Sequence, residues 1–290
     1  MSMYLTVQEF KNAPTGIDCS NIIPGGTQAQ SDAELFNIIR RASAWIDEIC
    51  KQKTLEATQN TETKEVTMNN SGLIRVHPDM MPILSLSTPQ YRISPAGPWI
   101  DLPLEYIQTL DRYFVIYNLN TFSISSALAL QFPTFSYFSP YRIRDLQRIP
   151  LTIQYTYING YPNTLTKDPS PAGSGTIDVI NPVGLTQGQL LTIYDNEFTE
   201  EITVQSVAGN VVTLSTPTLF DHAANIPISN LPAHVKQACV MLAAYLIKER
   251  GALSITMNES SMQGISRYKD ASDIDTAKEM LRPFIRGVVS

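Results

Sequence analysis

The residues that most often carry chemistry in proteins are few here and widely spaced. The three histidines, His77, His222 and His234, lie before a proline at a predicted strand end, in a predicted loop and at the start of a predicted helix. No HExxH or HxH motif and no Cys–His pair with metal-ligand spacing occurs. We therefore expect ordinary surface or hydrogen-bonded histidines and predict no metal site.

The cysteines indicate a reducing environment. Cys19, Cys50 and Cys239 are odd in number, far apart and outside any CxxC motif. Because Cys239 falls within an apolar run, buried free thiols are the expected state. The first residues, MSMYLTVQEF, lack a basic start followed by an apolar run, so no secretory signal is predicted. We expect the protein to be made and kept in a cytoplasm.

Two carboxylate pairs have the residue types of an acid–base dyad. Glu200 with Glu201, and Asp195 with Glu197, flank a predicted hairpin, where charges usually solvate a sheet edge. The glycine-rich segment 24–27 has no preceding buried strand and no lysine, which indicates a turn rather than a phosphate loop. No GxSxG or GxGxxG motif follows a predicted strand. We accordingly predict no catalytic residue, no cofactor and no enzymatic activity.

An aromatic stretch, FPTFSYFSPY over residues 132–141, interrupts the middle of the chain. Aromatic side chains supply large buried areas at interfaces, which favours a contact surface for another chain. The alternative is a loop folded back over the neighbouring strands. The residues concerned are Phe132, Phe135, Tyr137, Phe138 and Tyr141.

Composition indicates a globular protein that does not grip nucleic acid. Of the 290 residues, 43% are hydrophobic, and the formal net charge is −6 from 21 basic and 27 acidic residues. Tight nucleic-acid binding needs Lys and Arg to neutralise phosphates. The acidic excess lies mid-chain, with 8 basic and 14 acidic residues in 61–230, against 8 and 6 in 231–290.

The clearest predicted element is a helix within Leu231–Gly251. Pro232 suits its first turn, Gly251 suits a left-handed cap, and the run Ala238–Ile247 is apolar on every face. We expect a helix over 232–250 that is buried all round, as the centre of a helical subdomain. It is too short to span a bilayer.

A second long helix, over 31–51, is predicted from the capping box Ser31-x-x-Glu34 and from an apolar stripe. We expect this stripe to pack against the 232–250 helix. Shorter helices are predicted after the Thr6–Glu9 capping box and from Ser272 to Pro283. The stripe comprises Leu35, Ile38, Ile39, Ala42, Trp45, Ile46 and Ile49.

The predicted fold class is α+β: a small helical bundle, 1–56 and 231–290, split by a long antiparallel β insertion, 57–165, and a second small β-barrel-like module, 166–230. The Pro-, Ser- and Gly-rich segment Lys167–Gly175 is interpreted as a linker. Short runs rich in Val, Ile, Thr and Tyr predict the strands. These are Lys64–Met68, Leu73–Val76, Ile83–Ile93, Trp99–Leu102, Tyr113–Tyr117, Leu151–Ile158, Thr176–Ile180, Leu190–Tyr194, Glu201–Val207 and Val211–Ser215.

In order along the chain, these segments resemble the head–tail connector proteins, or adaptors, of tailed bacteriophages. The family's opening helices are similar to YLTVQEFKN and DAELFNIIRRASAWIDEIC, and its strand pair to ILSLSTPQYRISPAGPWIDL, with Gly97 and Trp99 in place. Its closing strand and Gly-Tyr-Pro exit are similar to LTIQYTYINGYP, its central helix to LPAHVKQACVMLAAYLIKERG and its last helix to AKEMLRPF. An extra β unit of some larger adaptors resembles GQLLTIYDNEFTEEITVQSVAGNVVTLSTP. The chain departs from the smallest members by its long β insertions.

The resemblance implies a structural virion protein with no active site. Such proteins form a homo-oligomeric ring, usually twelvefold, beneath the portal ring. They extend the DNA channel and offer a docking surface to the tail. The implied partners are the portal protein, a tail-side connector or tail terminator protein, other copies of the chain and DNA that passes without specific binding, with no membrane. The implied location is the neck of the virion, after synthesis in the host cytoplasm.

Portal contact is assigned, as a hypothesis, to the C-terminal region. Residues 252–271 are polar and aperiodic, and such segments often order only against a partner. Methionine adapts to irregular surfaces, and basic residues aid encounter with an acidic partner. The assigned residues are Met257, Met262, Ile265, Arg267, Lys269, Arg282 and Arg286. The aromatic stretch 132–141 is the competing contact, for a neighbouring copy or for the tail.

The alternative function is a carbohydrate- or receptor-binding β protein of the virion. A glycan-binding sandwich does not need a split helical core. Ring formation and portal binding, against sugar binding, distinguish the two functions.

Overall fold

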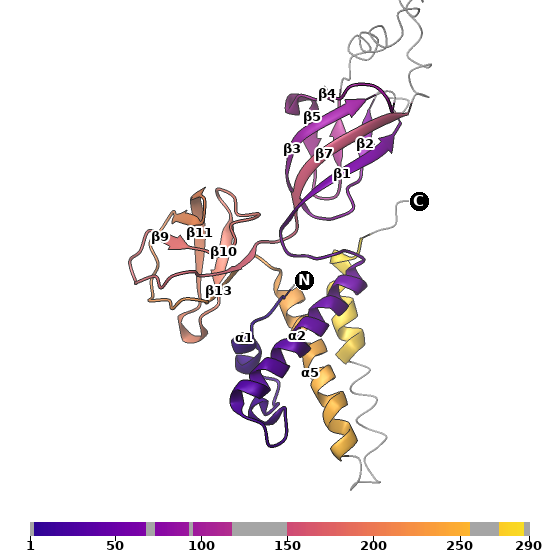
Figure 1. Cartoon of the computed structure of the whole chain (residues 1–290). Helices are drawn as coiled ribbons and strands as arrows, with labels where there is room; N and C mark the ends of the chain where they lie inside the picture. Colours follow the sequence, from indigo (N-terminus) through magenta and orange to yellow (C-terminus); the bar gives the residue numbers. More distant parts are fainter. Residues whose placement is uncertain (1–2, 68–72, 93–94, 118–149, 256–272, 287–290) are drawn as a thin grey trace, which may run out of the picture. The chain divides into compact units, whose positions relative to one another are not determined.

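The computed structural model describes residues 3–67, 73–92, 95–117, 150–255 and 273–286, and Figure 1 shows the course of the chain. It contains both helices and antiparallel sheets, which confirms the α+β fold class with a barrel-like module. Within the described residues, no helix is long and apolar enough to cross a membrane.

The chain forms two compact units. Unit 1 comprises Met1–Ala57 and Tyr161–Ser290, and unit 2 comprises Thr58–Gly160. Unit 1 contains the helices α1 (Val7–Asn12), α2 (Gln28–Cys50) and α5 (Ala233–Ile255), a further helix over residues 273–281, and the short 3-10 helices η1 (Cys19–Asn21) and η5 (Arg282–Phe284). It also contains the β module described below.

Helix α2 begins one turn earlier than predicted. Its N-cap is Thr27, whose hydroxyl accepts the Gln30 N–H at 3.3 Å while the Gln30 side chain accepts the Thr27 N–H at 2.8 Å. Both Thr27-x-x-Gln30 and Ser31-x-x-Glu34 have capping-box spacing, and the earlier box adds a turn of helix. Ser31 is instead buried inside the helix, and its hydroxyl donates to the carbonyl of Ser20 at 3.2 Å.

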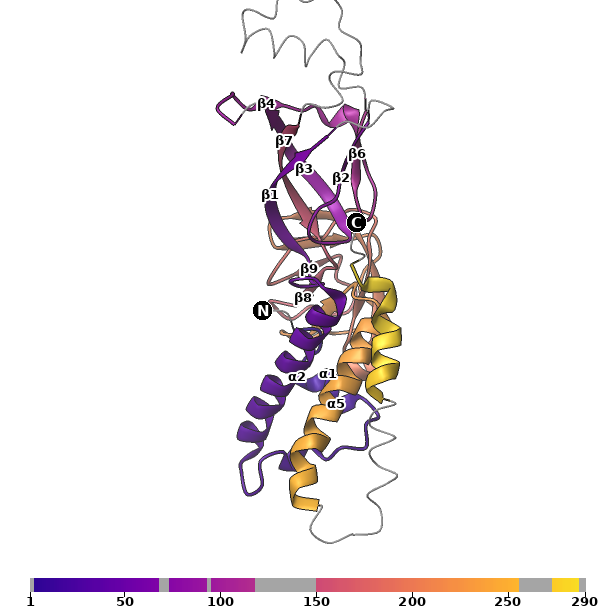
Figure 2. The same ribbon diagram turned by 90° about the vertical axis from the view of Figure 1, so that its right-hand side faces the viewer.

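Helices α2 and α5 pack side by side, as predicted, although they come from opposite ends of the sequence (Figures 1 and 2). Leu35, Ile38 and Leu242 are fully buried between them. The rings of Trp45 and Tyr245 pack edge-to-face, with centroids 6.1 Å apart. Ala277 and Leu281, on the helix over residues 273–281, complete this core.

The prediction that the central helix is buried all round is wrong. Ala238, Cys239 and Leu242 are buried, but Val240 and Ile247 are only half-buried. Among the described residues, the neighbouring helices bury one side of the apolar run of α5 and cover the other side only in part. The helix also continues through Gly251 to Ile255, so this glycine is not its cap; glycine inside a helix costs only about 1 kcal/mol relative to alanine.

Unit 2 is built from two antiparallel sheets. One has the order β1 (Thr58–Val66), β7 (Leu151–Asn159), β3 (Ile83–Arg92) and β4 (Ile100–Asp101); the other has β2 (Ile74–Val76), β6 (Phe114–Ile116) and β5 (Ile107–Thr109). Alternate residues of β7 are fully buried, and Tyr155 packs edge-to-face on Phe114 with ring centroids 4.9 Å apart. The apolar residues of both sheets form one core.

The β module of unit 1 is a six-stranded antiparallel sheet. Its strand order is β8 (Asn163–Leu165), β13 (Pro227–Ser229), β10 (Leu190–Ile193), β11 (Glu200–Ala208), β12 (Val211–Leu214) and β9 (Thr176–Asp178). An antiparallel bridge between Thr166 and Val179 joins the chain just beyond the two edge strands, which closes the sheet into a barrel-like form. Ile193, Ile202 and Val204 are among the residues of its separate core.

The segment Lys167–Gly175 is part of this module, and the interpretation of it as a linker is wrong. The Lys167 N–H donates to the Asp178 carbonyl at 2.8 Å, and the Gly173 N–H donates to the Thr218 carbonyl at 2.7 Å. Its Pro, Ser and Gly residues therefore form a loop bonded to the sheet. The module starts earlier, because β8 already pairs with β13.

The three cysteines are free, as predicted, but only Cys50 and Cys239 are buried; Cys19 is partly exposed, contrary to the expectation of buried thiols. Burial raises the pKa of both Cys50 and Cys239 to about 12. Their thiols are therefore poor nucleophiles, since the thiolate is the reactive form.

Candidate functional site

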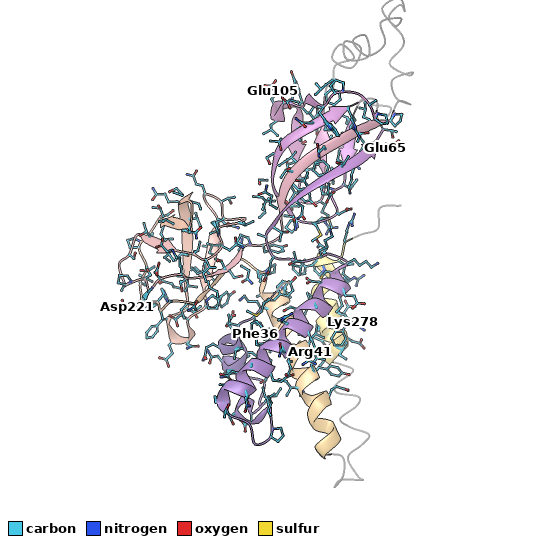
Figure 3. The ribbon with its side chains drawn as sticks, in the orientation of Figure 1. Phe36, Arg41, Glu65, Glu105, Asp221 and Lys278 are labelled. Carbon is cyan, nitrogen blue, oxygen red and sulfur yellow. The ribbon has the colours of Figure 1, made fainter. Side chains whose placement is uncertain are left out.

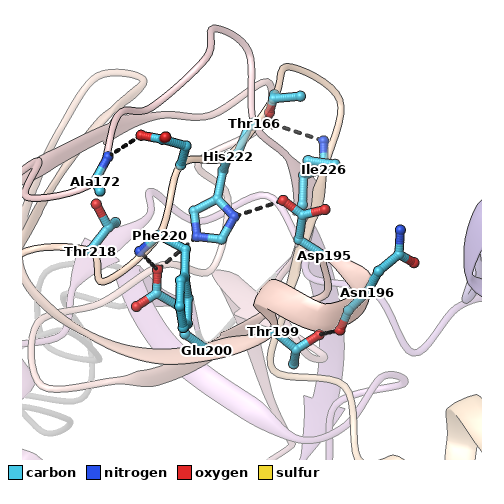
Figure 4. A network of polar contacts seen from close by, with 12 residues as sticks. Thr166, Ala172, Asp195, Asn196, Thr199, Glu200, Thr218, Phe220, His222 and Ile226 are labelled. Atoms are coloured by element: carbon cyan, nitrogen blue, oxygen red, sulfur yellow. Dashed lines mark hydrogen bonds and ion pairs between the residues drawn. The ribbon is translucent and has the colours of Figure 1, made fainter.

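A histidine buried between two carboxylates is the principal polar cluster of the β module. Asp195 follows β10, Glu200 opens β11, and His222 lies in the loop between β12 and β13. The His222 Nδ1 is 2.9 Å from Asp195 Oδ2, and its Nε2 is 2.7 Å from Glu200 Oε1. The imidazole is fully buried, the Glu200 carboxylate is 5% exposed, and the Asp195 carboxylate is only partly buried, at 15% exposed. Figure 4 shows the arrangement.

Backbone groups complete this network, which we call the His222 network. The Leu219 N–H donates to Glu200 Oε2 at 2.9 Å, and the Phe220 N–H lies 3.5 Å from Oε1 of the same side chain. The backbones of His222 and Ser170 exchange two hydrogen bonds of 2.8 Å. The network thus ties the loop at 218–222 to the start of β11 and to the 167–175 loop.

The hydrogen bonds at the two ring nitrogens of His222 limit the chemistry that this site can carry out. A neutral imidazole has one donor and one acceptor nitrogen, whereas the imidazolium donates from both. His222 faces a carboxylate at each nitrogen, so both bonds form as ordinary donor–acceptor pairs when the ring is charged. Neither nitrogen is left to take a proton from a nucleophile or to bind a metal.

Within the described residues, no group of three or more His, Cys, Asp and Glu side chains has an arrangement that could hold a metal ion. The hydrogen bonds of the His222 network join three separate segments, and the network thus acts as a clamp between loops. The network can therefore hold in place the side chains that these loops expose.

Sequence reasoning missed this cluster. Glu200 was assigned to a solvated sheet edge, and this is wrong, because only 7% of the residue is exposed. Its neighbour Glu201 does point to solvent, as an alternating strand requires. His222 is separated from Asp195 by 27 residues and from Glu200 by 22, with no motif spacing to link them. The only available signal was the strand alternation, which places Glu200 and Ile202 on the same, inward face.

A partly buried carboxylate that accepts several hydrogen bonds lies in unit 2. Glu62 accepts hydrogen bonds from the phenols of Tyr155, at 2.8 Å, and Tyr157, and from the Asp79 N–H at 2.9 and 3.1 Å. The ammonium of Lys64 is 3.3 Å away. Burial, assisted by the bonds to the Glu62 carboxylate, raises the pKa of both tyrosines far above the usual phenol value.

These two phenols should make unit 2 sensitive to alkali. Their unfolded pKa is about 10, so the stability from the protonated phenols is complete below that pH and is lost above it. We expect the double variant Tyr155→Phe and Tyr157→Phe to show a shallower loss of stability between about pH 10 and pH 12 than the native chain. The measurement is urea unfolding followed by amide exchange in β7. Tyr106→Phe, at an exposed phenol, is the control, and equal slopes in all three proteins would contradict the assignment.

Few of the predicted contact residues fall within the described chain. The aromatic residues Phe132, Phe135, Tyr137, Phe138 and Tyr141 lie outside it, as do Met257, Met262, Ile265, Arg267 and Lys269. Arg282 is exposed in η5, 3.6 Å from Glu279. Arg286 follows η5, and its N–H donates to the carbonyl of Cys50 at 3.0 Å.

Comparisons with known proteins leave the family open. No protein-family model matches the chain, and no curated protein matches it. One similar solved structure is the Gp54 tailspike of Acinetobacter baumannii bacteriophage AP22, in complex with A. baumannii capsular saccharide, at 22% identity and a TM-score of 0.20. The match covers 24% of this chain and 15% of that chain. A likeness of this extent supports no conclusion about fold or function.

Proposed function

We propose that this chain is a structural virion protein that forms a ring adaptor between the portal and the tail of a tailed bacteriophage and extends the DNA channel. The observation that carries the proposal is the split helical core. Helix α2 packs on α5, with the helix over residues 273–281 beside them, although two β regions separate them in sequence. A glycan-binding β protein, which is the alternative, has no need for such a core.

The elements also occur in the order of the family resemblance. The opening segments form α1 and α2, and the segment containing Trp99 joins the antiparallel pair β3 and β4. Strand β7 ends at Asn159, and the next residue, Gly160, turns the chain with a φ of 88°. The next residue, Tyr161, packs on the helical core and meets Phe284 edge-to-face, with ring centroids 6.2 Å apart.

In this proposal the chain lies in the neck of the virion. Its partners are the portal protein, a tail-side connector or tail terminator protein, and other copies of itself. DNA passes through the ring without specific binding, and the net charge of −6 suits a channel that must not hold phosphates.

Electron microscopy of the purified protein mixed with the portal protein tests the proposal. The expected result is a closed ring, usually twelvefold in this family, seated on the portal. A protein that stays monomeric with portal but binds capsular polysaccharide would support the alternative instead.

Portal docking by the basic C-terminal residues gives a further expected result. Replacing four of them by serine should weaken co-sedimentation with portal at low salt more than at moderate salt, because exposed charges act mainly on encounter and are screened. The four are Arg267, Lys269, Arg282 and Arg286. A matched control replaces the exposed Arg41, Lys51, Arg112 and Lys167. Equal binding by both variants and the native chain at both salts would exclude this contact.

A further inference from the structure

We propose that the tip of the β module is a docking surface for a cationic, partly apolar surface of a different protein. The tip comprises the apolar side chains of Phe198, Leu219 and Phe220, with the exposed carboxylates of Glu197 and Asp221 beside them. The proposed ring adaptor does not by itself assign a role to this surface.

The apolar side chains of the tip are unusually open to solvent. Leu219 is 72% exposed, the largest value among the exposed large hydrophobic residues of the described chain, and Phe198 is 48% exposed. The rings of Phe198 and Phe220 lie against each other, with centroids 5.4 Å apart. Single exposed apolar residues are ordinary, but a cluster on two adjoining loops marks an interaction surface.

The His222 network holds these loops in place before any partner arrives. Phe198 lies in the 3-10 helix η4 (Asn196–Phe198), between the two residues whose carboxylates bind His222. Leu219 and Phe220 are held by the bonds from their N–H groups to Glu200. Figure 4 shows Phe220 and Glu200 within the same network. A surface fixed in this way loses little conformational entropy when it binds.

Charge selects the kind of partner. Residues 168–235 contain no Lys or Arg but seven Asp and Glu residues; Asp195 and Glu200 bind His222, and four of the other five are exposed. The rest of the chain then has 20 acidic against 21 basic residues, so it is nearly neutral. Asp221 is exposed and lies at the edge of the module (Figure 3). This field repels nucleic acid and anionic lipid and attracts a basic protein surface. A second copy, whose remaining residues are nearly balanced in charge, is a poor match.

The first test uses cross-linking in the cell that makes the protein. A photoreactive phenylalanine replaces Leu219 in the full chain, and Ile180, which is 50% exposed elsewhere on the module, carries it in the control. We expect the probe at 219, but not at 180, to cross-link to one protein that is not this chain, identified by mass spectrometry. Cross-linking to a second copy, or equal products from both positions, would overturn the proposal, as would no product at 219.

The second test measures whether the tip prefers a cationic, partly apolar ligand. It compares binding of a labelled amphipathic peptide of Lys, Leu and Trp with binding of the matching peptide in which Glu replaces Lys. The full chain should bind the Lys peptide more tightly and lose affinity as salt rises. Changing Phe198→Ser with Leu219→Ser, or Glu197→Gln with Asp221→Asn, should each weaken binding about tenfold, which corresponds to about 1.4 kcal/mol. Asn at 221 keeps the oxygen that accepts the Ala172 N–H at 2.7 Å, so the loop is preserved.

Matched controls lie on the same module. They are Ile180→Ser with Val211→Ser for the apolar pair, and Asp168→Asn with Glu201→Gln for the charges, all at exposed positions. Equal weakening by the controls, or equal binding of both peptides, would refute the assignment. These results are independent of ring formation on portal, so failure of either proposal can be recognised separately.

Discussion

His222→Ala is expected to destabilise the β module by about 3–5 kcal/mol, because it leaves a buried carboxylate, Glu200, and a partly buried one, Asp195, without their shared partner. Asp195 and Glu200 each bind the imidazole, and only 7% of Glu200 is exposed. The removed ring also leaves a cavity, which adds to the loss. The network carries the loops at 218–222 and 195–200, so their amides should lose protection first.

Hydrogen exchange on the full chain measures this effect locally. Amides of β10, β11 and β13 should exchange faster in the variant, while those of α2 and unit 2 should change little. His234→Ala, at the exposed start of α5, is the control. A His222 variant with the same exchange pattern as the control would show that the buried pairing contributes nothing to stability.

The second large effect is expected at the centre of the helical core. Leu242 is fully buried where α5 meets α2, and Leu→Ala changes at such positions cost about 2–5 kcal/mol. Because the two helices share one core, the variant should weaken both of them together.

Chemical unfolding and amide exchange test that coupling. Protection should fall in α2 as well as in α5 in Leu242→Ala. The half-buried Leu246→Ala supplies a control in which less apolar area is lost. If α5 alone opened in Leu242→Ala, the two helices would not form one cooperative core.

The helical core was predictable because its signals are local. The stripe from Leu35 to Ile49 and the capping boxes identify the helices, and the pairing of α2 with α5 follows from their apolar faces. Where two capping boxes competed, at Thr27 and Ser31, sequence alone did not show which one begins the helix. The same limit applied to Gly251, because a glycine near a helix end favours a cap without requiring one.

The sheets were less completely predictable. The first residues of β1, TQNTET, are polar, and the strand exists because each residue from Thr58 to Val66 pairs with β7. Strands β8 and β13 are three residues each, too short for any alternation to be recognised. The His222 network arises only from the barrel-like closure, which brings three separate segments together.

The split core also sets the order of events during synthesis. Helix α2 leaves the ribosome with its apolar stripe uncovered, and its main partner α5 follows only after unit 2 and the β module have emerged. Unit 2 has its own core and contacts, so it can fold first, as domains generally do during translation. The nascent chain therefore carries an exposed apolar helix through most of its elongation, and closing the helical core is a late, long-range step.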